Sequence, residues 1–173
     1  MDSGDHHLSP AESAGIAPSS DWRLLDADCG FYRSFGPVFF KEAPDDHLIL
    51  GWRCAQRHLN PGGICHGAAL AAFADYAPLG AQYRLGFERI VVPTITLTVD
   101  LLHAVFLDDW LEARIEVTSR SGKMCHTQMV AYVGERAVLS SRGIFKLSNS
   151  EEILQSPFFQ QLRNLWPRSW LGQ

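Results

Sequence analysis

The stretch from Asn60 to Ala77, NPGGICHGAALAAFADYA, places a few polar residues beside a long apolar run. Asp75 is the only charged side chain between Gly67 and Tyr83, and the His66-Gly67 pair begins nine residues before it. A carboxylate is costly to bury without partners, so Asp75 is expected to be exposed at a site or held by polar neighbours. In a mostly apolar setting it would be poorly solvated and therefore more reactive toward water or a carbonyl group.

The cysteines offer a second kind of chemistry, which their spacing disfavours. Cys29, Cys54, Cys65 and Cys125 are widely and irregularly spaced and contain no C-x-x-C pair, so no metal site is expected. Cys65 is next to His66, but sequence neighbours rarely form a nucleophile and base pair, and no third orienting group is evident. Reduced thiols in a cytoplasmic protein are the simpler interpretation.

The charge and the hydropathy of the chain argue against two classes of partner, nucleic acids and membranes. The 173 residues carry a formal net charge of -4 and contain no basic stripe, which argues against a nucleic acid while leaving a small anionic ligand open. No uncharged apolar run reaches the roughly 18 residues of a membrane span, so no membrane partner is expected. Residues 1–20 lack the pattern of a signal peptide, and their composition predicts a disordered leader.

The elements that must position Asp75 can be read from the periodicity. A helix is predicted from Gly67 to about Arg84, with a kink or loosening at Pro78 and an end at Gly86. A short helix is predicted to begin at Asp21 and to end near Gly30. Period-two patterns predict strands at 37–43, 47–54, 94–101, 110–120, 124–133 and 136–147.

The predicted strand at 94–101 carries hydroxyl groups on one face. Its apolar residues alternate with Thr94, Thr96, Thr98 and Asp100, so Thr94 and Thr96 are expected on the same face about 7 Å apart. The β-propensity of threonine is an equally good explanation of the pattern.

The order of these elements predicts the fold. Two strands, one buried helix and four strands fit together only if the sheet curves around the helix. This is the hotdog arrangement of the α+β class, in which a curved antiparallel β-sheet is wrapped around a central buried α-helix. We expect the leader at 1–20, the hotdog domain at 21–150 and a helical C-terminal tail at 151–173.

The motif N-P-G-G-I-C-H-G-A…D at 60–75, followed by VPTITLTVDLLHA at 92–104, resembles the hotdog-fold acyl-CoA thioesterases of the phenylacetate-pathway (PaaI-like) type. The resemblance covers about residues 36–147. It implies hydrolysis of an acyl-CoA thioester without a metal or another cofactor. One residue departs from the family pattern: Ala68 stands where a second glycine is common, which affects how closely a substrate approaches.

The resemblance implies a role for each polar residue of the motif. Asp75 would be the general base or nucleophile, and Gly67 would donate its N–H to the oxyanion from the start of the helix. His66 would orient the loop or assist near the carbonyl, although a simple helix cap is as good an explanation. Asn60 would hold the water or the thioester, unless it only forms the turn before Pro61.

The resemblance also implies where the substrate lies. Thr94 would be near the catalytic water and Thr96 would contact substrate. The turn formed by Arg120, Ser121, Gly122 and Lys123 would lie along CoA, with its cations on phosphates, although a solvated hairpin is the default. The acyl pocket is open between medium-chain and aryl groups, with candidate lining residues Phe73, Tyr76, Leu79, Tyr83 and Phe87.

Two other functions are open at this point. A hotdog hydratase or dehydratase acting on β-hydroxyacyl thioesters would need a histidine, His58 or His66, paired with Asp75. A non-catalytic acyl-CoA-binding module is the third hypothesis, and the joint presence of Asn60, Gly67 and Asp75 argues against it. In all cases we expect a homodimer or homotetramer, because a single hotdog sheet leaves an edge unpaired.

Overall fold

The computed structural model describes residues 16–25, 30–43, 47–86, 90–157, 159 and 160. Its strands are β1 (Arg23–Leu25), β2 (Val38–Glu42), β3 (Leu48–Arg53), β4 (Ile90–Leu101), β5 (Trp110–Ser121), β6 (Met124–Val133) and β7 (Arg136–Ser148). Its helices are α2 (Gly30–Phe35), α3 (Gly67–Ala74), α4 (Ala77–Leu85) and α5 (Glu151–Leu154), with a 3-10 turn, η1, at Gln56–His58.

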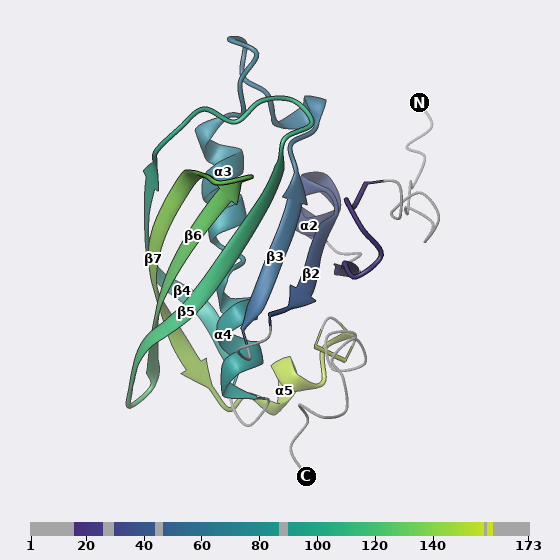
Figure 1. Ribbon diagram of the computed structural model, residues 1–173. Helices are drawn as coiled ribbons and strands as arrows, with labels where there is room; N and C mark the ends of the chain where they lie inside the picture. The colour runs from purple at the N-terminus through teal and green to yellow at the C-terminus, as the bar shows by residue number, and fades with distance from the viewer. Residues whose placement is uncertain (1–15, 26–29, 44–46, 87–89, 158, 161–173) are drawn as a thin grey trace.

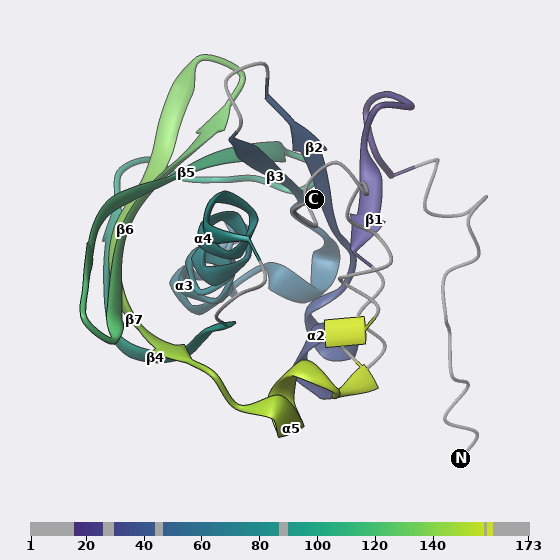
Figure 2. The same cartoon turned by 90° about the horizontal axis from the view of Figure 1, so that it is seen from below.

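The described strands form one antiparallel sheet in the order β1-β2-β3-β5-β6-β7-β4. Figures 1 and 2 show the sheet curling around α3 and α4, while α2 and α5 lie between its two ends. The predicted hotdog fold is therefore confirmed. The predicted strand pairs 37–43 with 47–54 and 124–133 with 136–147 form as antiparallel neighbours.

Alternation along β5 explains how the sheet packs on the helices. Leu111, Ala113 and Ile115 are buried on the inner face, as the period of two predicts, while Arg114 between them is exposed. Gly80 of α4 lies directly against this face, because a Cβ atom there would be only 2.7 Å from the Cβ of Ile115. The absence of a side chain at Gly80 thus lets α4 approach the sheet.

The predicted single helix is two helices in the structure. α3 ends at Ala74, and α4 begins at Ala77 with Pro78 in its first turn. Proline fits the first turn of a helix but not its interior, because it lacks the N–H that would bond to the preceding turn. The predicted disruption at Pro78 is therefore a complete break, and α4 ends at Gly86 as expected.

The prediction for the region before β2 is wrong. Instead of a helix from Asp21 to Gly30, the chain forms β1 first and then α2, which begins at Gly30. Tertiary packing favours the extended form, because Trp22 is buried against Trp110, with ring centroids 5.1 Å apart, above the bare backbone of Gly51.

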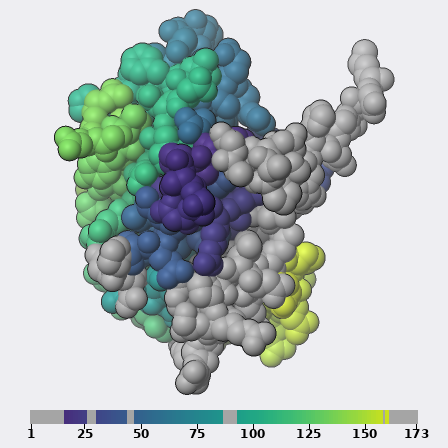
Figure 3. Space-filling view, turned by 45° about the vertical axis from the view of Figure 1, so that its right-hand side comes forward, coloured from purple at the N-terminus to yellow at the C-terminus, as the bar shows by residue number. Residues whose placement is uncertain are grey.

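Part of the predicted leader contacts the fold. The carbonyl of Ile16 accepts a hydrogen bond from Arg53 Nε at 2.8 Å, and residues 16–25 lie against β2 and β3 in Figure 3. Residues 1–15 lie outside the described part of the chain, so the boundary of the leader stays a prediction. At the other end, α5 begins the expected C-terminal helix, capped by Ser150. No helix among the described residues is long and apolar enough to cross a membrane.

Candidate active site

Asp75 lies at the break between the two central helices. It is the C-cap of α3, and its N–H donates to the carbonyls of Ala71 and Ala72. Its carboxylate is exposed in the single chain, and Oδ1 accepts a hydrogen bond of 2.8 Å from the hydroxyl of Thr94. Asp75 is thus both exposed and held by a polar neighbour, and the expected poor solvation does not hold for the single chain.

Thr94 reaches Asp75 because β4 is irregular at this point. The pairing of β4 with β7 shifts register on both sides of Thr94, next to Pro93, which cannot donate to the ladder. Thr94 therefore lies opposite Phe145, a residue buried on the inner face, whereas Thr96 lies opposite Ile144. Since paired residues share a face and neighbouring residues alternate, Thr94 and Thr96 lie on opposite faces of the sheet.

This geometry overturns the expectation that Thr94 and Thr96 share a face. A regular strand places residues two apart on the same side, and the bulge adds one residue between the two pairs. Thr96 is exposed on the outer face, away from Asp75, so the chain does not bring it to the site.

A cavity of about 620 Å³ opens beside Asp75 and Thr94. Its wall carries the aromatic rings of Phe31, Tyr32 and Tyr76, and small alanine side chains of α3 leave room in its centre. Its size and its largely apolar wall with few polar groups are typical of small-molecule sites. Asp75 and Thr94 are among the polar residues that line it, together with Tyr32 and Tyr76.

The cavity wall differs from the predicted one. Of the predicted residues Tyr76 lines it, whereas Phe73 and Leu79 are buried in the core, and Tyr83 packs against that core. Phe87 lies outside the described residues. Sequence reasoning missed Phe31 and Tyr32 of α2. The available signal was the aromatic pair Phe31 and Phe35, four residues apart between Gly30 and Gly36.

The other polar residues of the motif gather at the start of α3. His66 is its N-cap, and Nδ1 accepts a hydrogen bond of 3.0 Å from the N–H of Ala68. That bond requires an unprotonated Nδ1, so neutral His66 carries its proton on Nε2, where it can be donated. Both explanations of His66 are therefore compatible: it caps the helix and keeps one donor.

Gly67 follows as the first residue of α3. The N–H groups of Ala68, Ala69 and Leu70 all bond to His66, through its side chain or its carbonyl. Within the described part of the chain, the N–H of Gly67 has no acceptor. It is the donor that the positive end of the helix leaves for an anion or a carbonyl oxygen.

Asn60 shapes the turn that leads into α3. Its Oδ1 accepts from the N–H of Gly62 at 2.9 Å, and its backbone carbonyl accepts from the N–H of Gly63. The turn chemistry expected of Asn before Pro61 is therefore present, and the side-chain nitrogen remains without a partner among the described residues.

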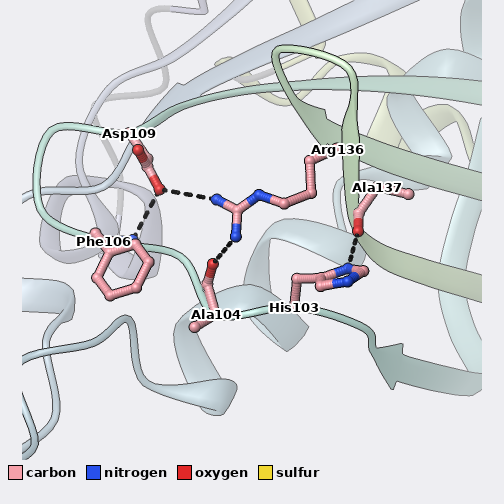
Figure 4. A network of polar contacts seen from close by, with 6 residues as sticks. All are labelled: His103, Ala104, Phe106, Asp109, Arg136 and Ala137. Carbon is pink, nitrogen blue, oxygen red and sulfur yellow. Dashed lines mark hydrogen bonds and ion pairs between the residues drawn. The ribbon is translucent and has the colours of Figure 1, made fainter.

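A neighbouring loop braces this end of the helix. The carbonyl of Val105 accepts from the N–H of Cys65 at 2.7 Å, just before His66. Figure 4 shows how the same loop is held to the start of β7. The guanidinium of Arg136 donates a hydrogen bond to the carbonyl of Ala104 and forms an ion pair with Asp109. The carboxylate of Asp109 also accepts a hydrogen bond from the N–H of Phe106, and the ring of His103 is hydrogen-bonded to the carbonyl of Ala137. The start of α3 is thereby fixed to the sheet.

Asp75 and Gly67 stand at opposite ends of α3. Eight residues separate them, which corresponds to about 12 Å along a helix axis. The oxygen of a reacting carbonyl must lie about 3 Å from its oxyanion donor, and the base must reach the carbonyl carbon directly or through one water molecule. Within one chain the two groups of candidate residues therefore lie apart, and we name them the acid half-site (Asp75 and Thr94) and the donor half-site (Asn60, His66 and Gly67).

His58 and Cys65 are structural in this chain. His58 is buried, Nδ1 accepts from the N–H of Ala55, and Nε2 is 2.7 Å from the carbonyl of Phe35, so both ring nitrogens are used. Burial lowers the pKa of His58 and keeps it neutral. Burial raises the pKa of the Cys65 thiol to about 12, which leaves it protonated and a poor nucleophile.

The predicted CoA turn lies away from both half-sites. Arg120 to Lys123 form the exposed hairpin between β5 and β6, where Gly122 adopts a positive φ of 54°. Figure 1 shows this hairpin at the opposite end of the sheet from the loop that enters α3. Within the described chain, Arg120 and Lys123 have no carboxylate partner. No cluster of three or more potential metal ligands occurs among the described residues.

Solved structures share this fold at low sequence identity. The Escherichia coli PaaI protein from the phenylacetic acid degradation operon has 20% identity and a TM-score of 0.55, covering 63% of this chain and 82% of its own. A Haemophilus influenzae thioesterase has 18% identity and a TM-score of 0.59, with coverage of 65% and 78%. A Streptococcus pneumoniae thioesterase, solved with coenzyme A, has 20% identity and a TM-score of 0.56, with coverage of 64% and 87%.

Sequence comparison establishes the family. The model of the thioesterase superfamily matches residues 62–140, which include Gly67, Asp75 and Thr94. A Pseudomonas aeruginosa protein named as an esterase is 30% identical over 115 residues, which cover 65% of this chain and 84% of that protein. The chain belongs to the thioesterase superfamily.

Proposed function

We propose that this thioester hydrolase cleaves medium-chain or aryl acyl-CoA thioesters to the free acid and CoA. The observation that carries the proposal is the acid half-site at the edge of the apolar cavity of about 620 Å³. A reactive carboxylate beside an apolar cavity suits a substrate with a polar reacting centre and an apolar acyl group. The CoA-bound Streptococcus pneumoniae structure of the same fold supports the choice of thioester.

The half-sites suggest how the reaction proceeds. Asp75 accepts a proton from water while the water oxygen bonds to the thioester carbon, and Thr94 holds the carboxylate in place. The negative charge that develops on the carbonyl oxygen is stabilised by the N–H of Gly67, and His66 Nε2 can assist. The carbon–sulfur bond then breaks, and the proton passes to the leaving sulfur to give the thiol of CoA and the free acid.

This mechanism requires two chains. Because about 12 Å separates the half-sites along α3, Asp75 of one subunit would act with Gly67 of another. β4 pairs with β7 on one side only among the described strands, and it exposes Ile95 and Leu101. An apolar unpaired edge of this kind favours association, which supports a homodimer or homotetramer.

CoA would be bound away from the reacting carbon. Arg120 and Lys123 lack carboxylate partners and flank a turn, which supports the proposal that they contact the phosphates of CoA. Thr96 is not part of this proposal, because it lies on the outer face of the sheet.

The two alternative functions have less support. A hydratase would need a histidine free to exchange protons with substrate, and His58 is buried with both ring nitrogens engaged. Of the two candidate histidines, His66 remains for that role. A binding module without catalysis would not need a carboxylate at the cavity, where Asp75 is held by Thr94.

Release of free CoA from a panel of acyl-CoA substrates tests the activity. We expect thiol release from hexanoyl-, octanoyl- or phenylacetyl-CoA by the purified protein. Hydration of an enoyl-CoA without thiol release would instead favour the hydratase. Binding without turnover of any member would favour the non-catalytic module.

Two inactive variants, combined in one oligomer, test the shared site. Gly67→Pro removes the N–H of residue 67. Proline is tolerated at this first helical position, and the preceding residue, His66, already has the extended backbone that a following proline requires. In a dimer that carries Gly67→Pro on one chain and Asp75→Asn on the other, one of two shared sites stays intact. Co-expression with two affinity tags should then recover about half of the wild-type activity per dimer.

The matched control for this experiment is Gly67→Ala. It keeps the N–H and adds only a methyl group, which the flexible end of Leu101 must make room for. Gly67→Ala should therefore retain more activity than Gly67→Pro. No activity in the mixed dimer, with both parents folded, would show that each site lies within one chain.

A further inference from the structure

We infer that α2 selects the acyl group: Phe31, together with Tyr32, forms the wall of the cavity that sets the length and shape of the acyl chain. The inference rests on the proposed function and extends it to residues outside the part of the chain that matches the family model. α2 spans Gly30–Phe35, whereas the match begins at residue 62. Gly67, Asp75 and Thr94 thus lie inside the matched region, whereas the wall formed by α2 lies outside it.

α2 is firmly held at its C-terminal end. Phe35 is buried and stacks on Trp52, with ring centroids 5.0 Å apart. Its carbonyl is 2.7 Å from His58 Nε2, and the backbone of His58 in turn accepts from the N–H of His66. The anchor of α2 is therefore bonded directly to the loop that carries the donor half-site.

The same helix face carries Phe31 one turn earlier. Residues four apart on a helix lie above one another, and the rings of Phe31 and Phe35 are stacked with centroids 5.9 Å apart. Phe35 enters the core, but Phe31 lines the cavity and remains 60% exposed. A large apolar ring that is exposed at a cavity wall contributes little to stability and can contribute to ligand binding.

Tyr32 links this wall to the acid half-site. Its ring packs edge-to-face against Tyr76, the residue after Asp75, with centroids 5.1 Å apart. An acyl group in the cavity would therefore contact α2 on one side and β4, near Thr94, on the other. The distance from the reacting carbon to the end of the cavity would be set by Phe31.

Two substitutions of opposite size at Phe31 test the inference. Phe31→Ala lengthens the cavity, and Phe31→Trp shortens it, while the exposed position should leave the melting temperature of both variants near wild type. The measured quantity is the ratio of kcat/KM for decanoyl-CoA to that for phenylacetyl-CoA. We expect the ratio to rise about tenfold in Phe31→Ala and to fall about tenfold in Phe31→Trp, since a pocket discriminates a methylene by about 10- to 200-fold.

Tyr132→Ala is the matched control, because Tyr132 is also an exposed aromatic residue but lies on β6 and does not line the cavity. Its ratio should stay within about twofold of wild type. Ratios that are unchanged in both Phe31 variants, or shifted in the same direction, would overturn the inference while leaving the hydrolase intact. Absence of thiol release by the wild type would instead refute the proposed function itself.

Discussion

Replacing Asp75 by Asn separates the catalytic role of this residue from a structural one. The amide keeps the shape of the side chain, and its oxygen can still accept the hydrogen bond from Thr94 that is 2.8 Å long in the wild type. The charge and the basicity are lost. Loss of the principal base commonly costs about 10²- to 10⁴-fold in rate, or about 3–5 kcal/mol of transition-state stabilisation.

We therefore expect kcat to fall at least about a hundredfold in Asp75→Asn, measured as CoA thiol release at saturating substrate. CoA affinity, measured by calorimetry, should change little, because the proposed phosphate contacts lie elsewhere. Stability should stay level rather than rise, since the carboxylate is exposed in the single chain and its hydrogen bond survives. The free energy of unfolding should stay within about 1 kcal/mol of wild type.

Asp100→Asn is the matched control. Asp100 is also an exposed acid. Unlike Asp75 it lies on the outer face of β4, where its carboxylate is 3.5 Å from the guanidinium of Arg142. This variant should retain wild-type kcat. The catalytic reasoning is falsified if Asp75→Asn hydrolyses its best acyl-CoA at near wild-type rate, and a large drop in melting temperature with normal kcat would make Asp75 structural.

Three further predictions concern neighbouring features. Thr94→Val should lower kcat about ten- to a hundredfold, because it removes the hydrogen bond to the carboxylate of Asp75. Thr96→Val, on the other face of the sheet, should keep kcat within about twofold of wild type. Equal effects of the two substitutions would contradict the observed register. Because burial lowers the pKa of His58, the unfolded chain binds a proton that the folded chain does not, so urea denaturation should show stability decreasing as the pH falls below about 6.5. His58→Gln should flatten that pH dependence, and equal slopes would exclude His58 as the cause. Deletion of residues 1–15, which stops short of the hydrogen bond at Ile16, should change the melting temperature by no more than about 2 °C.

Much of the fold followed from periodicity. The alternating apolar residues of β5 predict a sheet with one buried face, and the apolar run around Asp75 predicts a buried helix. A sheet covers such a helix only if it curves around it. Pro78 also predicted a disruption of the helix, since its missing N–H is a local property of the chain, although the structure has a complete break instead of the predicted kink or loosening. Asp75 thus lies at the break because Pro78 follows it three positions later.

The failures occurred where distant residues decide. Residues 21–30 have no strong local preference, and the burial of Trp22 against Trp110 makes β1 a strand rather than the predicted helix. The face of Thr94 depends on the register between β4 and β7, which a strict period of two cannot anticipate. The cavity wall from α2 was missed because Phe31 and Tyr76 are 45 positions apart in the sequence and meet only in the folded chain.

The sequence alone determined the chemistry that is available: one carboxylate in an apolar run, a His-Gly pair before it, and the hotdog fold that carries them. These follow from residue types and short-range spacing, which the covalent chain specifies. Tertiary structure decided which of the threonines reaches Asp75 and which aromatic side chains form the cavity. The separation of Asp75 and Gly67, by contrast, already follows from the predicted helix, because a helix converts eight positions of sequence into about 12 Å along its axis.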